Sequence, residues 1–301
     1  MSKKGFKHHI LPQIYLRQFV CDSRHSSQSG LLYARRPEWS DWKLLHSKRV
    51  GFKRGFYSAT PAKDTETEFI ENNLAVIEGE FGRVVRDVLN PMKNLDVPDQ
   101  EVLSYFLALM HSRTLEARES INALPKQIIE KIMWNILQFG VSDENLAQIE
   151  DPKQREEFSE FLRTMTKEKA VEFMENTEIT ITTNLFHLLW ISESMKILGR
   201  LFLHKQWSIL YSKEGLFITS DNPTCTVPQE DFGPYPYSPA FPSVLVTLPL
   251  TKHHLLTCVN ERESDDVPYV PVDSSLVDYA NYAQIVQWKE WLISPIPFNV
   301  S

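Results

Sequence analysis

The chain of 301 residues is 42% hydrophobic and 24% charged, which provides a large core and excludes a disordered protein. No run is apolar for the roughly 18–20 residues that a membrane span needs, and the polar N-terminus lacks the apolar stretch of a secretory signal. Three widely separated cysteines without a C-x-x-C pair argue against a disulfide framework and a zinc knuckle. These features predict a cytoplasmic protein with a single domain over 1–301.

Positive charge is concentrated near the N-terminus. Residues 1–57 carry twelve basic and three acidic side chains, a balance of +9, whereas the whole chain carries −7. Aromatic residues are interleaved with these charges, namely Tyr33, Trp39, Trp42, Phe52, Phe56 and Tyr57. Such mixing is typical of surfaces that contact phosphates and stack on bases. The candidate substrate-binding residues are Gln13, Arg17, Arg35, Lys53 and Arg54. Alternatively, the aromatic residues face a core and the basic residues form the wet side of the same strands.

The predicted elements begin with short strands over 31–36 and 42–45, in a basic region that covers 1–60. A capping box at Thr65–Glu68 then opens a helix whose apolar spacing continues to about Leu89. A second helix starts at Asp96-Val97-Pro98. Further helices fit 126–138, 152–175 and 181–202, so 65–203 is expected to be a helical region.

After Leu203 the pattern changes to strands, which 204–301 combines with one helix. Residues 207–211 and 216–219 predict a hairpin around Gly215. A proline-rich loop follows over 223–242, then a strand pair over 243–248 and 254–259, and a helix over 274–288. The expected class is α+β, with a mainly antiparallel sheet built from both ends of the chain and packed with the helical middle.

The densest run of chemically distinctive residues extends from His8 to Phe19. Pro12 suits the first turn of a short helix, because its fixed φ is helical and it has no N–H to satisfy. Tyr15, Leu16 and Phe19 fall within one turn of each other and should anchor this helix to a core. The two histidines before the helix therefore suit either a functional site or an N-terminus that is merely anchored to the core.

Several blocks together support a resemblance over the whole chain. They are the opening block from His8 to Phe19, Glu78 on a helix, Arg113, the block Ile218–Pro223 and the run Leu248-Pro249-Leu250. With these blocks the chain resembles the bacterial domain of unknown function 4238 family. It departs from the family pattern at Ile10-Leu11, where an aromatic residue and a valine are expected. The resemblance implies no particular activity, because the family is named for lacking one.

Two polar positions allow both a structural and a functional interpretation. Arg113 continues an apolar helix stripe, so its charge needs a partner. That partner is either Glu78, in an ion pair between two helices, or the phosphate or carboxylate of a ligand. Asp221 follows a strand, where it either acts as a catalytic carboxylate or closes a turn with Asn222 before Pro223.

Several known motifs are absent from the sequence. His-His-x-x-Pro resembles the start of an HNH nuclease, but no partner residues follow at a suitable spacing. Ser220-Asp221-Asn222 matches part of the penicillin-recognising enzymes, yet no S-x-x-K or K-T-G motif accompanies it. The chain has no Walker loop, no G-x-G-x-x-G and no H-E-x-x-H, which excludes the corresponding kinase, dehydrogenase and zincin sites.

Two classes of function fit these observations. The first is a metal-assisted phosphodiesterase or nuclease that uses a divalent metal ion and a nucleic-acid substrate. Its candidate catalytic residues are His8 and His9 as general base or metal ligand, Glu78 and Asp221 as ligands of the ion or of water, Arg113 as a phosphate contact, and Asn222. The second class is a non-catalytic binding or sensor module whose basic face docks nucleic acid or protein.

Overall fold

The computed structural model describes residues 7–21, 30–54, 65–119, 151–164, 184–230 and 238–299, with isolated positions 131, 146, 166, 168 and 169. At 7–9, 53–54, 65–71, 73, 162–163 and 184–189 it describes the backbone alone. The chain divides into two compact units, one formed by 1–118 with 183–301 and one by 119–182. In the second unit the helix α6 (Pro152–Thr164) is described. The division into three regions of one domain stays a prediction.

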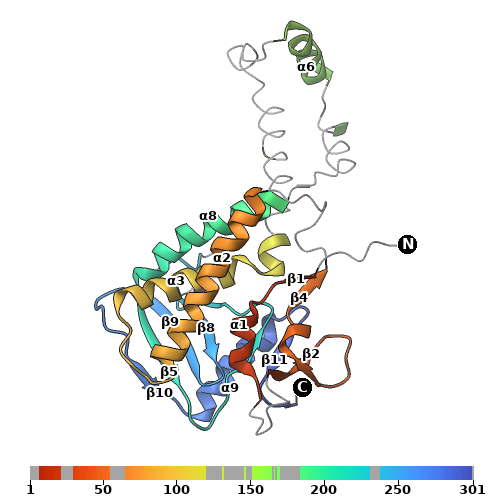
Figure 1. Ribbon diagram of the computed structural model, residues 1–301. Coiled ribbons are helices and arrows are strands. Elements are labelled where there is room, and N and C mark those ends of the chain that lie inside the picture. The colour runs from red at the N-terminus through yellow and green to blue at the C-terminus, as the bar shows by residue number, and fades with distance from the viewer. Residues whose placement is uncertain are drawn as a thin grey trace. The chain divides into compact units, whose positions relative to one another are not determined.

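Three long helices of the first unit pack side by side and cover one face of a sheet (Figure 1). They are α2 (Thr65–Val84), α3 (Val97–Ser112) and α8 (Asn184–Leu203). A π-helical turn continues α2 to Leu89, which confirms the predicted end. The predicted helix over 126–138 lies almost entirely outside the described residues. No helix in the described part of the chain is long and apolar enough to cross a membrane.

The sheet beneath these helices has five strands in the order β10-β5-β9-β8-β7. Their bounds are β5 (Lys205–Tyr211), β7 (Cys225–Pro228), β8 (Val244–Thr251), β9 (His254–Glu261) and β10 (Tyr269–Pro271). Successive side chains of a strand point to opposite faces. Accordingly Leu256 joins the main core, whereas Leu255 packs with Val277 of α9 (Ser274–Gln287) in a second, smaller cluster. The predicted pairing of 243–248 with 254–259 is confirmed.

A second sheet joins the two ends of the chain. Its order is β3-β2-β11-β6, and its strands are β2 (Leu31–Arg35), β3 (Lys43–His46), β6 (Thr219–Ser220) and β11 (Leu292–Ser294). Leu292 of β11 lies opposite Arg35 on one side and Ser220 on the other. A separate antiparallel pair is formed by β1 (Lys7–His9) and β4 (Phe52–Arg54). The α+β class with a mainly antiparallel sheet from both ends is therefore confirmed.

The predicted hairpin over 207–219 is wrong. Strand β5 pairs with β9 and β10, whereas Thr219 pairs with Ile293 of β11. The intervening residues turn away because they find other partners: the Phe217 N–H donates to the Lys252 carbonyl, and the Ile218 N–H to the Asn281 side chain. Long-range backbone partners thus override the local turn signal at Gly215.

The opening block is anchored in the core as predicted. Tyr15 and Leu16 of α1 (Gln13–Leu16) and Phe19 of the 3₁₀ turn η1 (Arg17–Phe19) are fully buried, while Arg17 is exposed. The Tyr15 hydroxyl donates to the Pro249 carbonyl at 2.8 Å and lies 2.7 Å from the Thr219 hydroxyl. This one side chain therefore ties the N-terminal helix to strands β6 and β8.

A buried histidine at the start of β9 should make stability depend on pH. Burial lowers the pKa of His254 to about 4, and the neighbouring His253 acts in the same direction. An unfolded histidine has a pKa near 6.5, so below that pH the unfolded chain binds a proton that folded His254 does not. The contribution of neutral His254 to the free energy of unfolding is therefore fully present above about pH 6.5 and is lost as the pH falls through about 4. Between pH 7 and pH 5 the free energy of unfolding should fall by about 2 kcal/mol more in the wild type than in His254→Gln.

Urea unfolding at the two pH values measures this difference. The matched control is His204→Gln at an exposed position, which should keep the pH dependence of the wild type. Equal pH dependence in the wild type and His254→Gln would contradict the prediction.

Candidate ligand-binding pocket

An open pocket of about 660 Å³ lies where the second sheet meets β4. Basic, aromatic and other side chains line it, namely Arg36, Trp39, Lys43, Leu45, Arg49, Phe52, Glu290 and Trp291. We call it the basic pocket. Its lining carries three cations against one carboxylate, and its volume is within the range of roughly 300–1,000 Å³ found for small-molecule sites. The pocket therefore suits an anionic ligand with a flat ring system.

One wall of the basic pocket is held by the opening block. The N–H groups of Ile10 and Leu11 donate to the Gly51 carbonyl at 2.8 and 3.2 Å. Gln13 donates to the Ser47 carbonyl at 3.0 Å, and the Ser47 hydroxyl donates back to the Gln13 amide oxygen at 3.3 Å. These bonds fix the 3₁₀ turn η3 (Ser47–Arg49) and the start of β4, which carry Arg49 and Phe52 into the pocket.

Gly51 is required between these two elements. Its φ of +64° lies in the left-handed region, and an added Cβ would lie 3.0 Å from Leu11 Cβ and 3.3 Å from Leu16 Cδ1. A residue with a side chain here would be strained and would displace the opening block from this wall.

The opposite wall is held by Asp221. Its two carboxylate oxygens accept the Lys289 and Glu290 N–H groups at 3.0 and 2.8 Å, and its own N–H donates to the Trp291 carbonyl at 2.9 Å. The Asp221 residue is 1% exposed, and burial raises the pKa of its carboxyl group while these N–H donors act in the opposite sense. The Asp221 carboxylate thus holds a distant segment, 289–290, and its described bonds do not close the turn with Asn222 that one interpretation of the sequence expected. This contact places Glu290 and Trp291.

Cations and rings alternate inside the basic pocket. The Arg36 guanidinium lies over the Trp291 ring at 4.9 Å, and the Lys43 ammonium lies over the Trp39 ring at 4.1 Å. The Trp39 and Trp291 rings meet edge to face at 5.8 Å. Trp291 is buried, whereas Trp39 and Phe52 are half-buried. The two half-buried rings are consequently the ones that a ligand can reach.

The candidate catalytic residues have several different surroundings. Glu78 accepts from Arg113 at 2.7 Å, so the structural ion pair between α2 and the end of α3 is present, with side chains 24% and 12% exposed. Asn222 donates to Glu116 at 2.9 Å. The catalytic roles of these residues stay predictions.

Two of the remaining predicted residues have described side chains, and four have a described backbone alone. Arg17 is exposed, and Arg35 is half-buried on β2. For His8, His9, Lys53 and Arg54 the structure gives the backbone, in which His9 lies opposite Phe52 and His8 opposite Lys53, and their side chains lie outside the described residues. Among the described residues, no group of three or more His, Cys, Asp or Glu side chains is placed to hold a metal ion.

The sequence interpretation missed Glu290 and Trp291. Both stand between a predicted helix and the short apolar run that becomes β11, and no local pattern links them to residues 36–52. The pairing of β2 with β11 is what brings Glu290 and Trp291 next to residues 36–52. The basic and aromatic mixture in 1–57 was the signal for Arg36, Trp39, Lys43, Arg49 and Phe52.

Fold and site together define an α+β protein with a basic, aromatic pocket framed by its two chain ends. The model of the family described as "Protein of unknown function (DUF4238)" matches residues 7–295, nearly the whole chain, so the chain belongs to this family. No curated protein and no solved structure matches the chain.

Proposed function

We propose that this protein is a nucleic-acid-binding module and that the basic pocket is its binding site. The observation that supports the proposal is that Arg36, Lys43 and Arg49 share one concave site with the half-buried rings of Trp39 and Phe52. Guanidinium and ammonium groups neutralise phosphates, and aromatic rings stack on bases. The negative charge of the rest of the chain discourages indiscriminate binding of polyanions.

Fluorescence anisotropy of a labelled oligo(U) or oligo(dT) of about 12 nucleotides tests this proposal. The triple variant Arg36→Ala, Lys43→Ala, Arg49→Ala should bind at least about tenfold more weakly than the wild type. Its slope of log K against log salt concentration should be shallower by about 2, because three phosphate contacts are removed.

The matched control removes three cations at exposed positions elsewhere, namely Lys93→Ala, Lys196→Ala and Lys213→Ala. It carries the same net charge as the pocket variant, and we expect near wild-type affinity. If both triple variants lost the same affinity for the oligonucleotide, the loss would be due to net charge alone, and this result would contradict a specific binding site.

A phosphodiesterase activity is the alternative, and the same reagents test it. Glu78 and Asp221 already accept hydrogen bonds from Arg113 and from the backbone, which favours binding over metal-assisted cleavage. Cleavage of the labelled strand with magnesium or manganese that disappears in His9→Ala and in chelator would favour the enzyme. An intact strand that still binds supports the module.

A further inference from the structure

We propose that the basic pocket takes one unpaired nucleotide of a single strand, with its phosphate on Nη2 of Arg36 and its base against Trp39 or Phe52. This inference rests on the proposed function and narrows its ligand to single-stranded nucleic acid.

The guanidinium of Arg36 keeps one nitrogen for a ligand. Its Nη1 contacts the Glu38 carboxylate at 3.0 Å, whereas its Nη2 lies 3.9 Å from Glu290, beyond a hydrogen bond. Its Nε is shielded from water and has no acceptor among the described residues. Nη2 is therefore the nitrogen that can donate a charge-assisted hydrogen bond to a phosphate.

The ring under this guanidinium also contains a donor without an acceptor. The indole Nε1 of Trp291 is buried without a hydrogen-bond partner among the described residues, and the Arg36 guanidinium lies over the same ring. Both Nε atoms are shielded from solvent, whereas Nη2 of Arg36 is not, so Nη2 is the donor that a phosphate can reach.

Access to the aromatic rings should distinguish a single strand from a duplex. Trp39 and Phe52 lie inside the pocket among cations, so a base can stack on them only when it leaves its own stack. Extracting a paired base from a duplex costs a few kcal/mol, whereas a single strand presents its bases at little cost. The pocket should therefore discriminate strand type, which a basic surface alone would not do.

The test compares a labelled single strand of about 12 nucleotides with the duplex of the same sequence, at one salt concentration, by fluorescence anisotropy. We expect the single strand to bind at least about tenfold more tightly than the duplex. Trp39→Ala should remove most of this preference, with little change in duplex binding. Arg36→Lys keeps the charge but removes the planar guanidinium with its Nη2 donor, and should weaken single-strand binding several-fold.

The matched control is Trp190→Ala, an exposed tryptophan of α8, which should keep wild-type binding. Circular dichroism and thermal unfolding check that each variant is folded. If Trp39→Ala does not fold, Trp39→Leu and quenching of wild-type tryptophan fluorescence by the single strand replace it. Equal affinity for duplex and single strand, both lost in the pocket triple variant, would overturn this inference and leave nucleic-acid binding in place. Binding of neither would overturn both.

Discussion

Replacing Asp221 with alanine should lower the free energy of unfolding by about 3 kcal/mol. The carboxylate accepts two backbone N–H groups from the 289–290 segment, and removing it leaves both donors without their acceptor. Because this segment carries Glu290 and Trp291, affinity for the single strand should fall at least about tenfold as well. Denaturant unfolding measures the first effect, and fluorescence anisotropy at a temperature where the variant is folded measures the second.

Two variants separate this role from a general loss of charge. Asp221→Asn keeps one carbonyl oxygen and should lose about half as much stability, since one of the two N–H groups keeps an acceptor. Asp278→Ala removes an exposed carboxylate from α9 and should change stability by less than about 0.5 kcal/mol. Wild-type stability and affinity in Asp221→Ala would show that the carboxylate does not hold this wall.

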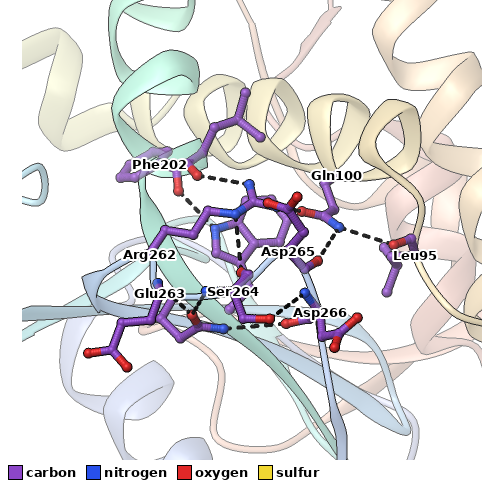
Figure 2. Close-up of polar contacts among 11 residues, drawn as sticks. Leu95, Gln100, Phe202, Arg262, Glu263, Ser264, Asp265 and Asp266 are labelled. Carbon is purple, nitrogen blue, oxygen red and sulfur yellow. Dashed lines mark hydrogen bonds and ion pairs between the residues drawn. The ribbon is translucent and has the colours of Figure 1, made fainter.

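Replacing Arg262 with methionine should also cost about 3 kcal/mol of unfolding free energy, while leaving ligand affinity unchanged. Figure 2 shows this guanidinium at the centre of a polar network that fastens the loop after β9 to the helical layer. It donates to the Leu203 carbonyl at 3.1 Å, to the Gln100 side chain at 2.6 Å and to the Ser264 carbonyl at 3.2 Å, and pairs with Asp265 at 2.9 Å.

The cost follows from the two acceptors in the helical layer, Gln100 and Leu203, which would lose this donor. Gln100 is 2% exposed, and the Leu203 carbonyl is at the end of α8, where no further helical N–H is available. The control is Arg86→Met, because Arg86 is 70% exposed and pairs with its neighbour Asp87. We expect the control to stay within about 0.5 kcal/mol of the wild type. An equal loss in both variants would contradict the assigned role of the network.

Elements with local signals could be predicted from the sequence. The helix after Asp96 begins with a side-chain cap to the Asp99 N–H, and β8 and β9 are adjacent in the chain, so neighbouring residues contain the information. The hairpin over 207–219 failed because β6 is completed by β11, more than 70 residues further on. Long-range pairing of this kind leaves no periodic signal in either segment.

The described residues that line the basic pocket include none of the site residues predicted from the sequence. Gln13 of the opening block and Asp221 were recognised from their residue types, and their described contacts hold backbone groups of the pocket walls. Residue type could not distinguish a carboxylate that binds a ligand from one that binds a turn, because both roles use the carboxylate oxygens as hydrogen-bond acceptors. The pocket itself depends on Trp291, whose place beside Arg36 is set by the tertiary fold.

The position of β11 between β2 and β6 affects the order in which the pocket can form during synthesis. More than 250 residues separate strand β2 from its partner Leu292–Ser294 and the adjacent Trp291, so β2 is made well before them. A nascent chain that lacks this last segment has one wall of the basic pocket and lacks the opposite one. Ligand binding should therefore begin only after the C-terminal strand has closed the second sheet.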